Sequence, residues 1–204
     1  MTFSEAVTSA GNVTLTTDTG RTCTFAITSS TTGSCNYTVQ AGDNSSDLNV
    51  STVSGTITDG ASLPMVNFTP TTNLAANKAI VIDTTAPSVP TNTLPNGTYV
   101  NTDGWDFNWN VSTDNQPGAI TYEYQASQNP AVDGLGVLTT GLWSSGDLGT
   151  TNMIHSAGAA QGTWYWQVRA KDAVGNYSAW SPVATVTKDT IAPVISTDDS
   201  FITV

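Results

Sequence analysis

Apolar and polar side chains alternate along several short segments, a period of two that is typical of β-strands with one buried face. The alternate residues expected to point into a core are Trp105, Phe107, Trp109 and Val111; Ile120, Tyr122, Tyr124 and Ala126; and Trp164, Trp166, Val168 and Ala170. Residues between them, such as Gln167 and Arg169, are expected to face outward. No long segment has the 3.6-residue period of an amphipathic helix, so the pattern predicts an all-β fold.

A short repeat divides the chain. The segment 82–87 (I-D-T-T-A-P) recurs at 188–193 (K-D-T-I-A-P), 106 residues later, and each copy follows a β-prone run. A spacing of about 100 residues is the size of one immunoglobulin-like (Ig-like) sandwich. The repeat predicts two Ig-like β-sandwich modules in tandem, 1–86 and 87–188, and then a connector with an unpaired strand, 189–204. Proline fixes its own φ angle and biases the preceding residue toward an extended conformation, so each D-T-x-A-P connector restrains the angle between the modules that it joins.

The connector sequence resembles the short linkers between tandem Ig-like modules of bacterial surface proteins. The segments 3–7, 37–44 and 57–60 look like parts of one such module. The segments 164–172, 175–176 and 178–181 look like a fibronectin type III-like module of the same proteins. The resemblance implies a structural or adhesive role, although sandwich folds host many functions.

One motif in the second module has a more specific parallel. Tyr177-Ser178-Ala179-Trp180-Ser181 is similar to the W-S-x-W-S segment of cytokine-receptor fibronectin modules, with Tyr in place of the first Trp. In those modules strand arginines stack between aromatic rings. The resemblance implies that Arg169 stacks on Tyr177 or Trp180, a structural cation–π contact of about 0.5–2 kcal/mol.

Composition and charge exclude several classes of function from what we expect of this chain. Charged residues make up 10% of the chain, the formal net charge is −11 with five Lys and Arg, and Thr and Ser number 36 and 20. Nucleic acid and anionic membranes are therefore not expected partners, and no apolar run is long enough for membrane insertion. One His (His155) and two Glu, Glu5 and Glu123 in different predicted modules, give no catalytic constellation. We expect no enzyme activity and no required cofactor.

The two cysteines predict a disulfide. Cys23 and Cys35 lie 12 positions apart around the turn-prone segment 29–34, so an antiparallel hairpin would bring them opposite each other. The alternative is a pair of buried thiols. A disulfide indicates an oxidising compartment, here the extracellular space or bacterial cell surface.

Two ligand hypotheses stay open. Asp83, Asp103 and Asp189 lie near the predicted module ends, where they would hold calcium or simply be solvated turn residues. All six Trp lie in the second module, and period-2 placement assigns Trp105, Trp109, Trp164 and Trp166 to the core. Trp143 and Trp180 are the better candidates for an exposed glycan-binding platform.

The ends of the chain suggest a subunit interface. Phe3 and Val7 are expected at the end of a second strand whose preceding strand is missing, and the C-terminal segment carries β-prone apolar residues with nothing after them to pair with: Val194, Ile195, Phe201, Ile202 and Val204. In one interpretation this segment completes the open sandwich of the next copy, a form of β-augmentation that can build a head-to-tail fibre. In the other, the chain is a piece of a longer array of repeats.

These observations predict a structural protein of the bacterial cell surface, a stalk or filament subunit whose main partner is a second copy or a neighbouring repeat. The alternative is an adhesin module that binds a surface glycan or a host. An enzyme is the least favoured class, because no pair of acidic residues has the arrangement of a glycosidase.

Overall fold

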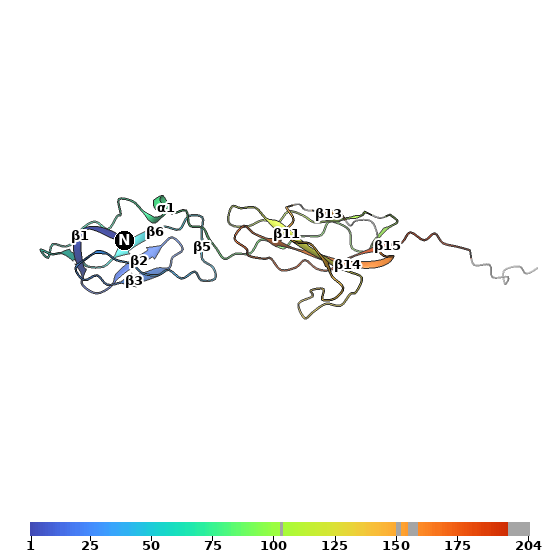
Figure 1. Cartoon of the computed structure of the whole chain (residues 1–204), viewed down its shortest axis with the longest axis horizontal. Helices are drawn as coiled ribbons and strands as arrows, with labels where there is room; N and C mark the ends of the chain where they lie inside the picture. The colour runs from blue at the N-terminus through green and yellow to red at the C-terminus, as the bar shows by residue number, and fades with distance from the viewer. Residues whose placement is uncertain (103, 150–151, 155–158, 196–204) are drawn as a thin grey trace, which may run out of the picture. The chain divides into compact units, whose positions relative to one another are not determined.

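The computed structural model describes residues 1–102, 104–149, 152–154 (backbone only) and 159–195. Apart from one helical turn, α1 (Leu74–Asn77), its regular elements are all strands (Figure 1), so the predicted all-β class is confirmed. The chain divides into two compact units, which are described separately below. Unit 1 comprises residues 1–85 and 115–117, and unit 2 comprises 86–114 and 118–204.

Unit 1 is a small sandwich of two three-stranded sheets, in the orders β4-β1-β7 and β3-β2-β6, with a two-stranded ribbon of β5 and β8. Its strands are β1 (Thr2–Ser9), β2 (Val13–Thr17), β3 (Thr22–Phe25), β4 (Ser30–Thr32), β5 (Asn44–Ser45), β6 (Val50–Ser54), β7 (Ile57–Asp59) and β8 (Ile82–Asp83). The pairings β1–β7, β2–β3 and β2–β6 are all antiparallel. Both sheets contribute to the core, which consists of Val7, Val13, Phe25, Ile27 and Ile57.

Unit 2 has a five-stranded sheet of order β12-β11-β14-β15-β9 and a second sheet that contains β10 and β13. Its strands are β9 (Thr98–Val100), β10 (Asp106–Asn108), β11 (Thr121–Ser127), β12 (Trp143–Ser144), β13 (Asn152–Ile154), β14 (Gly162–Lys171) and β15 (Ala184–Lys188). Figure 1 shows β11, β14 and β15 side by side. The segment 88–93 runs beside 108–113: the Ser88 N–H donates to the Thr113 carbonyl oxygen and the Thr93 N–H to that of Asn108, both at 2.8 Å. This arrangement is a fibronectin type III-like sandwich.

The core of unit 2 is aromatic. Trp166 and Phe107 are fully buried and their ring centroids lie 4.8 Å apart. The four tryptophans that period-2 placement assigned to the core are buried: Trp105, Trp109, Trp164 and Trp166. The prediction of inward faces is therefore confirmed for β10, β11 and β14.

Val111, Gln125 and Gln167 depart from the predicted alternation. Val111 is 72% exposed, because the alternation breaks after β10 and Ser112 takes the inward position, where its N–H donates to the Tyr122 hydroxyl at 2.7 Å. Gln167 is fully buried although it was expected to face outward. Its cross-strand neighbour Gln125 donates to the carbonyl oxygen of buried Leu138. The segment that carries Leu138 therefore covers this outer face of the sheet.

The buried Gln167 side chain yields a stability prediction. Its amide nitrogen and oxygen have no hydrogen-bond partner among the described residues. Since an unsatisfied buried amide costs free energy, Gln167→Met should stabilise unit 2 by about 1 kcal/mol. Differential scanning calorimetry would show this as a rise in melting temperature of about 4–8 °C. Gln125→Met is the matched control, because it removes the hydrogen bond to Leu138 and should not stabilise; an equal rise in both variants would contradict the explanation.

Candidate functional site

Unit 1 contains an apolar groove of about 960 Å³. It is lined by residues of β1, β6 and β7 and of the segment 63–74, and its main apolar side chains are Phe3, Val7, Val53, Met65 and Phe68. Val7 is buried, whereas the other four are only half-buried and pack against the core from its margin. The acidic side chains in the lining are Glu5 and Asp59, and no Lys or Arg lines the groove. The groove therefore suits an apolar or weakly polar occupant.

An unpaired strand edge borders this groove. β6 pairs with β2 through the register Leu15↔Val53 and Thr16↔Thr52. In unit 1, all of whose residues the structure describes, no strand lies on the other side of β6. One contact on β6 comes from the Asn73 side chain, whose amide donates to the Val50 carbonyl oxygen at 3.1 Å. An edge with open N–H and C=O groups is a template for an added strand.

The predicted interface residues fall in two places. Phe3 and Val7 both line the groove. Their strand, β1, was expected to lack a neighbour, but it pairs with β4 on one side and β7 on the other, so the open edge beside the groove is that of β6. Val194 and Ile195 are 88% and 94% exposed. Phe201, Ile202 and Val204 lie outside the described residues, and their role stays a prediction.

Sequence reasoning missed Met65 and Phe68, which form much of the groove wall. The Met65 N–H donates to the Ile57 carbonyl oxygen at 2.8 Å, which holds this segment against β7. A signal was present, because Met65 and Phe68 are large apolar residues in a stretch rich in Thr, Pro and Asn. A single pair of this kind has no periodicity to indicate which way it faces.

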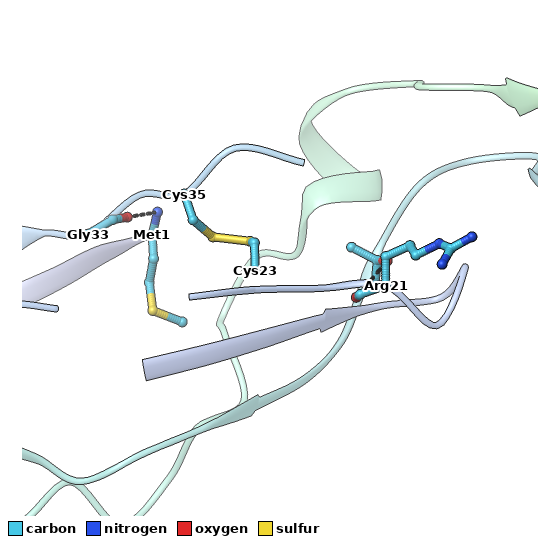
Figure 2. The surroundings of a disulfide bond; sticks show 6 residues. Met1, Arg21, Cys23, Gly33 and Cys35 are labelled. Carbon is cyan, nitrogen blue, oxygen red and sulfur yellow. Dashed lines mark hydrogen bonds between the residues drawn. A yellow bond between two sulfur atoms is a disulfide. The ribbon is translucent and has the colours of Figure 1, made fainter. Parts of the chain in front are cut away.

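The disulfide between Cys23 and Cys35 is confirmed, with the two Cα atoms 5.8 Å apart (Figure 2). The predicted hairpin is wrong. β3, which carries Cys23, pairs with β2, and Cys35 lies outside any strand. Between them β4 pairs instead with β1. The disulfide therefore fastens an irregular segment to the edge of a sheet.

A buried carboxylate holds the rest of this irregular segment. Asp43 is 2% exposed, and it accepts from the Arg21 Nε at 2.6 Å, the Tyr37 hydroxyl at 2.8 Å and the Gln40 N–H at 2.9 Å. Burial alone would raise the pKa of Asp43, but the hydrogen bonds from Gln40, Arg21 and Tyr37 and the charge of Arg21 hold that pKa below its ordinary value. The Asp43 carboxylate is thus a structural anchor.

In unit 2 a cation lies between two aromatic rings. The Arg169 guanidinium carbon lies 4.1 Å from the centroid of the Tyr177 ring and 4.7 Å from that of Trp180. The guanidinium also pairs with Glu123, with Nη2 and Oε2 2.6 Å apart. The structure therefore brings together the three residues that the fibronectin resemblance implied. Because Arg169 lies over the Trp180 ring, and Trp180 is only half-exposed, that ring is a poor platform for a ligand.

Trp143 has a different environment. It belongs to the edge strand β12, its side chain is 43% exposed, and it borders a groove of about 680 Å³. The groove is also lined by Gln128, Asn129, Pro130 and Trp164. Of the two tryptophans proposed for ligand binding, Trp143 is the one that lies at a concave surface.

The aspartates of the connector repeat share one local structure. The Asp83 Oδ1 accepts from the Thr85 N–H, and the Asp189 Oδ1 accepts from the Ile191 N–H, each at 3.0 Å. Each carboxylate thus stabilises the turn that opens its own D-T-x-A-P segment. Asp103 lies outside the described residues. Calcium binding by these three aspartates remains a prediction.

Comparisons with known proteins give limited similarity. No family model matches the chain. Over 124 residues it is 36% identical to chitinase A1 of Niallia circulans, an alignment that covers 57% of this chain and 15% of that protein. Among solved structures, it is similar to the solution structure of the fibronectin type-III domain of human fibronectin type III domain containing protein 3. The TM-score is 0.36 and the identity 16%, over 52% of this chain and 90% of that one.

The fold and these surfaces define a class: an all-β protein of sandwich units with a disulfide, whose second unit is fibronectin type III-like. Within the part of the chain that the structure describes, no helix has the length and apolar character needed to cross a membrane.

The turn after β14 yields a prediction about pH. Asp172 is buried, and its Oδ1 accepts from the N–H groups of Val174, Gly175 and Asn176 at 2.7–2.9 Å. Burial alone would raise the pKa of Asp172, but the hydrogen bonds from Asn176, Gly175 and Val174 lower it below its ordinary value. The folded-state pKa is therefore below the unfolded one. The stabilisation is complete above the ordinary pKa of about 3.9 and is lost as the pH falls through the lowered value.

We expect Asp172→Asn to lower the melting temperature at pH 7 by several degrees and to lose less stability than the wild type between pH 5 and pH 2. Thermal unfolding followed by circular dichroism across this range would test it. Asp189→Asn is the control, because Asp189 is exposed and its carboxylate accepts a single backbone hydrogen bond in the described structure. Equal acid sensitivity in the wild type and Asp172→Asn would contradict this role of the carboxylate.

Proposed function

We propose that this chain is a structural protein of the bacterial cell surface or extracellular space, whose copies join head to tail by donating a strand. The observation that carries the proposal is the apolar groove of unit 1 beside the unpaired edge of β6. A groove of this kind leaves apolar surface in contact with water. An added strand would cover that surface and satisfy the open backbone groups of β6.

The proposed occupant is residues 191–204 of a second copy. By the repeat, Ala192 and Pro193 correspond to Ala86 and Pro87, so the segment after Pro193 corresponds to 88–93. In unit 2 that segment runs beside 108–113 with backbone hydrogen bonds. The equivalent C-terminal residues Val194 and Ile195 are exposed, which supports their availability to another copy. The contact is heterologous, so it extends into a fibre unless the rotation closes a ring.

Several features support an extracellular, non-catalytic role. The disulfide between Cys23 and Cys35 favours an oxidising compartment. The chain spans about 15% of the length of chitinase A1, the relative that it matches. A segment that matches 15% of a longer protein is compatible with an accessory or spacer unit of a larger extracellular protein.

A peptide-binding experiment tests strand donation. A chain that ends at residue 190 should bind a fluorescent peptide of residues 191–204 in a saturable way, measured by anisotropy. Met65→Glu should weaken binding at least about tenfold, since it puts a charge in the apolar groove. Val66→Glu is the matched control, because Val66 is 91% exposed and absent from the groove lining. Both groove and peptide are acidic, through Glu5, Asp59, Asp198 and Asp199, so added salt should strengthen binding.

Assembly of the whole chain is the second part of this test. Analytical ultracentrifugation should show concentration-dependent oligomers for residues 1–204 and a monomer for 1–190. A full-length chain that stays monomeric at every concentration, or peptide binding that Met65→Glu leaves unchanged, would refute the proposal.

A second candidate function is accessory carbohydrate binding in an extracellular protein. The specific observation in its favour is the groove beside Trp143, an exposed indole next to amide side chains. The similarity to a protein named as a chitinase supports a polysaccharide setting. This candidate is compatible with strand donation, because its surface belongs to unit 2 alone.

Retention on an insoluble polysaccharide tests this candidate. The wild-type chain should co-sediment with chitin or cellulose more than bovine serum albumin does under the same conditions. Absence of retention on either polymer, together with no binding of soluble oligosaccharides, would rule out this candidate function.

A further inference from the structure

We propose that the groove beside Trp143 is a binding site for an uncharged glycan chain, in which one sugar ring stacks on the Trp143 indole. This inference rests on the second candidate function and names its site and ligand class. The groove, of about 680 Å³, lies within the range of small-ligand sites in proteins. It lies at the end of the five-stranded sheet of unit 2, where β12 pairs with β11.

The indole of Trp143 is a supported platform. Its ring centroid lies 4.9 Å from that of Trp164, with an angle of 55° between the two planes. Trp164 is 4% exposed, and its indole N–H donates to the Ala160 carbonyl oxygen at 3.1 Å. A buried, hydrogen-bonded ring therefore holds one side of Trp143 while 43% of the Trp143 side chain remains exposed. A preset aromatic face binds the apolar face of a sugar ring with little loss of side-chain entropy.

Two neighbouring amides are oriented by their own hydrogen bonds. The Gln128 Nε2 donates to the Gln161 carbonyl oxygen at 2.8 Å, which leaves the Gln128 amide oxygen to accept from a ligand. The Asn129 Oδ1 accepts from the Ala131 N–H at 2.9 Å, which leaves the Asn129 amide nitrogen to donate. Both side chains are exposed and line the groove. Since a sugar hydroxyl both donates and accepts, this pair matches a polyhydroxylated ligand.

Charge selects among glycans. None of the described residues that line this groove is charged, and the chain as a whole carries a net charge of −11. A uronic or sulfated glycan would meet repulsion from the protein, and the described lining residues include no cation to offset it. A neutral glycan meets no such repulsion, so the proposed ligands are neutral oligosaccharides.

Isothermal titration calorimetry with cellohexaose, chitohexaose and a hexamer of galacturonic acid tests the site. The neutral hexamers should bind the wild-type chain, and the galacturonate hexamer should not. Trp143→Ala should weaken neutral-hexamer binding at least about tenfold, as expected for the central aromatic contact of a site. Tyr99→Ala is the matched control, because Tyr99 is an aromatic residue of unit 2 that is 76% exposed and absent from this groove.

Because Trp143 contacts Trp164, the alanine variant must be shown to keep the thermal melting temperature of the fold. An independent readout uses the wild-type chain. The indole N–H signal of Trp143 in a nitrogen-15 NMR spectrum, assigned with Trp143→Phe, should shift on titration with the neutral hexamer, while the signal of Trp166 should not move.

Neutral-glycan binding that Trp143→Ala leaves intact, without a shift of the Trp143 signal, would overturn the site but not the candidate function. Preference for the galacturonate hexamer would overturn the assignment of ligand class. Absence of binding by the wild type would overturn both the site and the candidate function.

Discussion

The apolar surface that unit 1 leaves uncovered is the constraint on which the rest of its structure depends. Its buried core consists of five side chains, whereas that of unit 2 has thirteen among the described residues. Phe3, Met65 and Phe68 pack against the small core but remain half-exposed in the groove. Hydrophobic stabilisation scales with the apolar area removed from water, so unit 1 obtains less of it than unit 2. The groove thus leaves apolar side chains partly in contact with water, and any segment that covered them would add hydrophobic stabilisation to the unit.

Covalent and ionic contacts offset part of that deficit. The segment from Gly33 to Asp43 contains no strand, so its backbone gains little from sheet pairing. The disulfide fixes its start, and the Asp43 carboxylate fixes its end through Arg21, Tyr37 and Gln40. Close packing adds a local requirement, since a Cβ on Gly33 would lie 2.1 Å from the Phe25 ring. Small sandwiches with limited cores commonly rely on disulfides in this way, because the crosslink restricts the unfolded chain.

The sequence predicted unit 2 better than unit 1 for a physical reason. In β11 and β14 the alternation of large apolar and polar residues is long enough to fix which face is buried, so the aromatic core follows directly. The exceptions arise from contacts distant in sequence. Gln167 is buried because the segment around Leu138 covers it, and the hairpin expected around Ser29–Ser34 fails because β3 and β4 pair with different strands. In unit 1 the strands are short and rich in Thr, so their two faces differ little in hydrophobicity, and residues such as Met65 and Phe68 have no period to place them.

Trp180 and Trp143 differ in whether a charged side chain covers the ring, and this difference determines whether a ligand could stack on it. From sequence both Trp180 and Trp143 were candidates for an exposed platform, and only Trp180 had an alternative role, stacking on Arg169. In the structure Arg169 lies 4.7 Å from the Trp180 ring centroid and is itself held by Glu123. A ligand that stacked on that face would have to displace a guanidinium already engaged in cation–π and ionic contacts, each of which stabilises the fold. Trp143 instead rests against Trp164, an uncharged ring, and keeps an exposed face beside two oriented amides. The same residue type therefore supports the fold at Trp180 and lies partly exposed beside a groove at Trp143, and the difference comes from the residue that lies beside each ring.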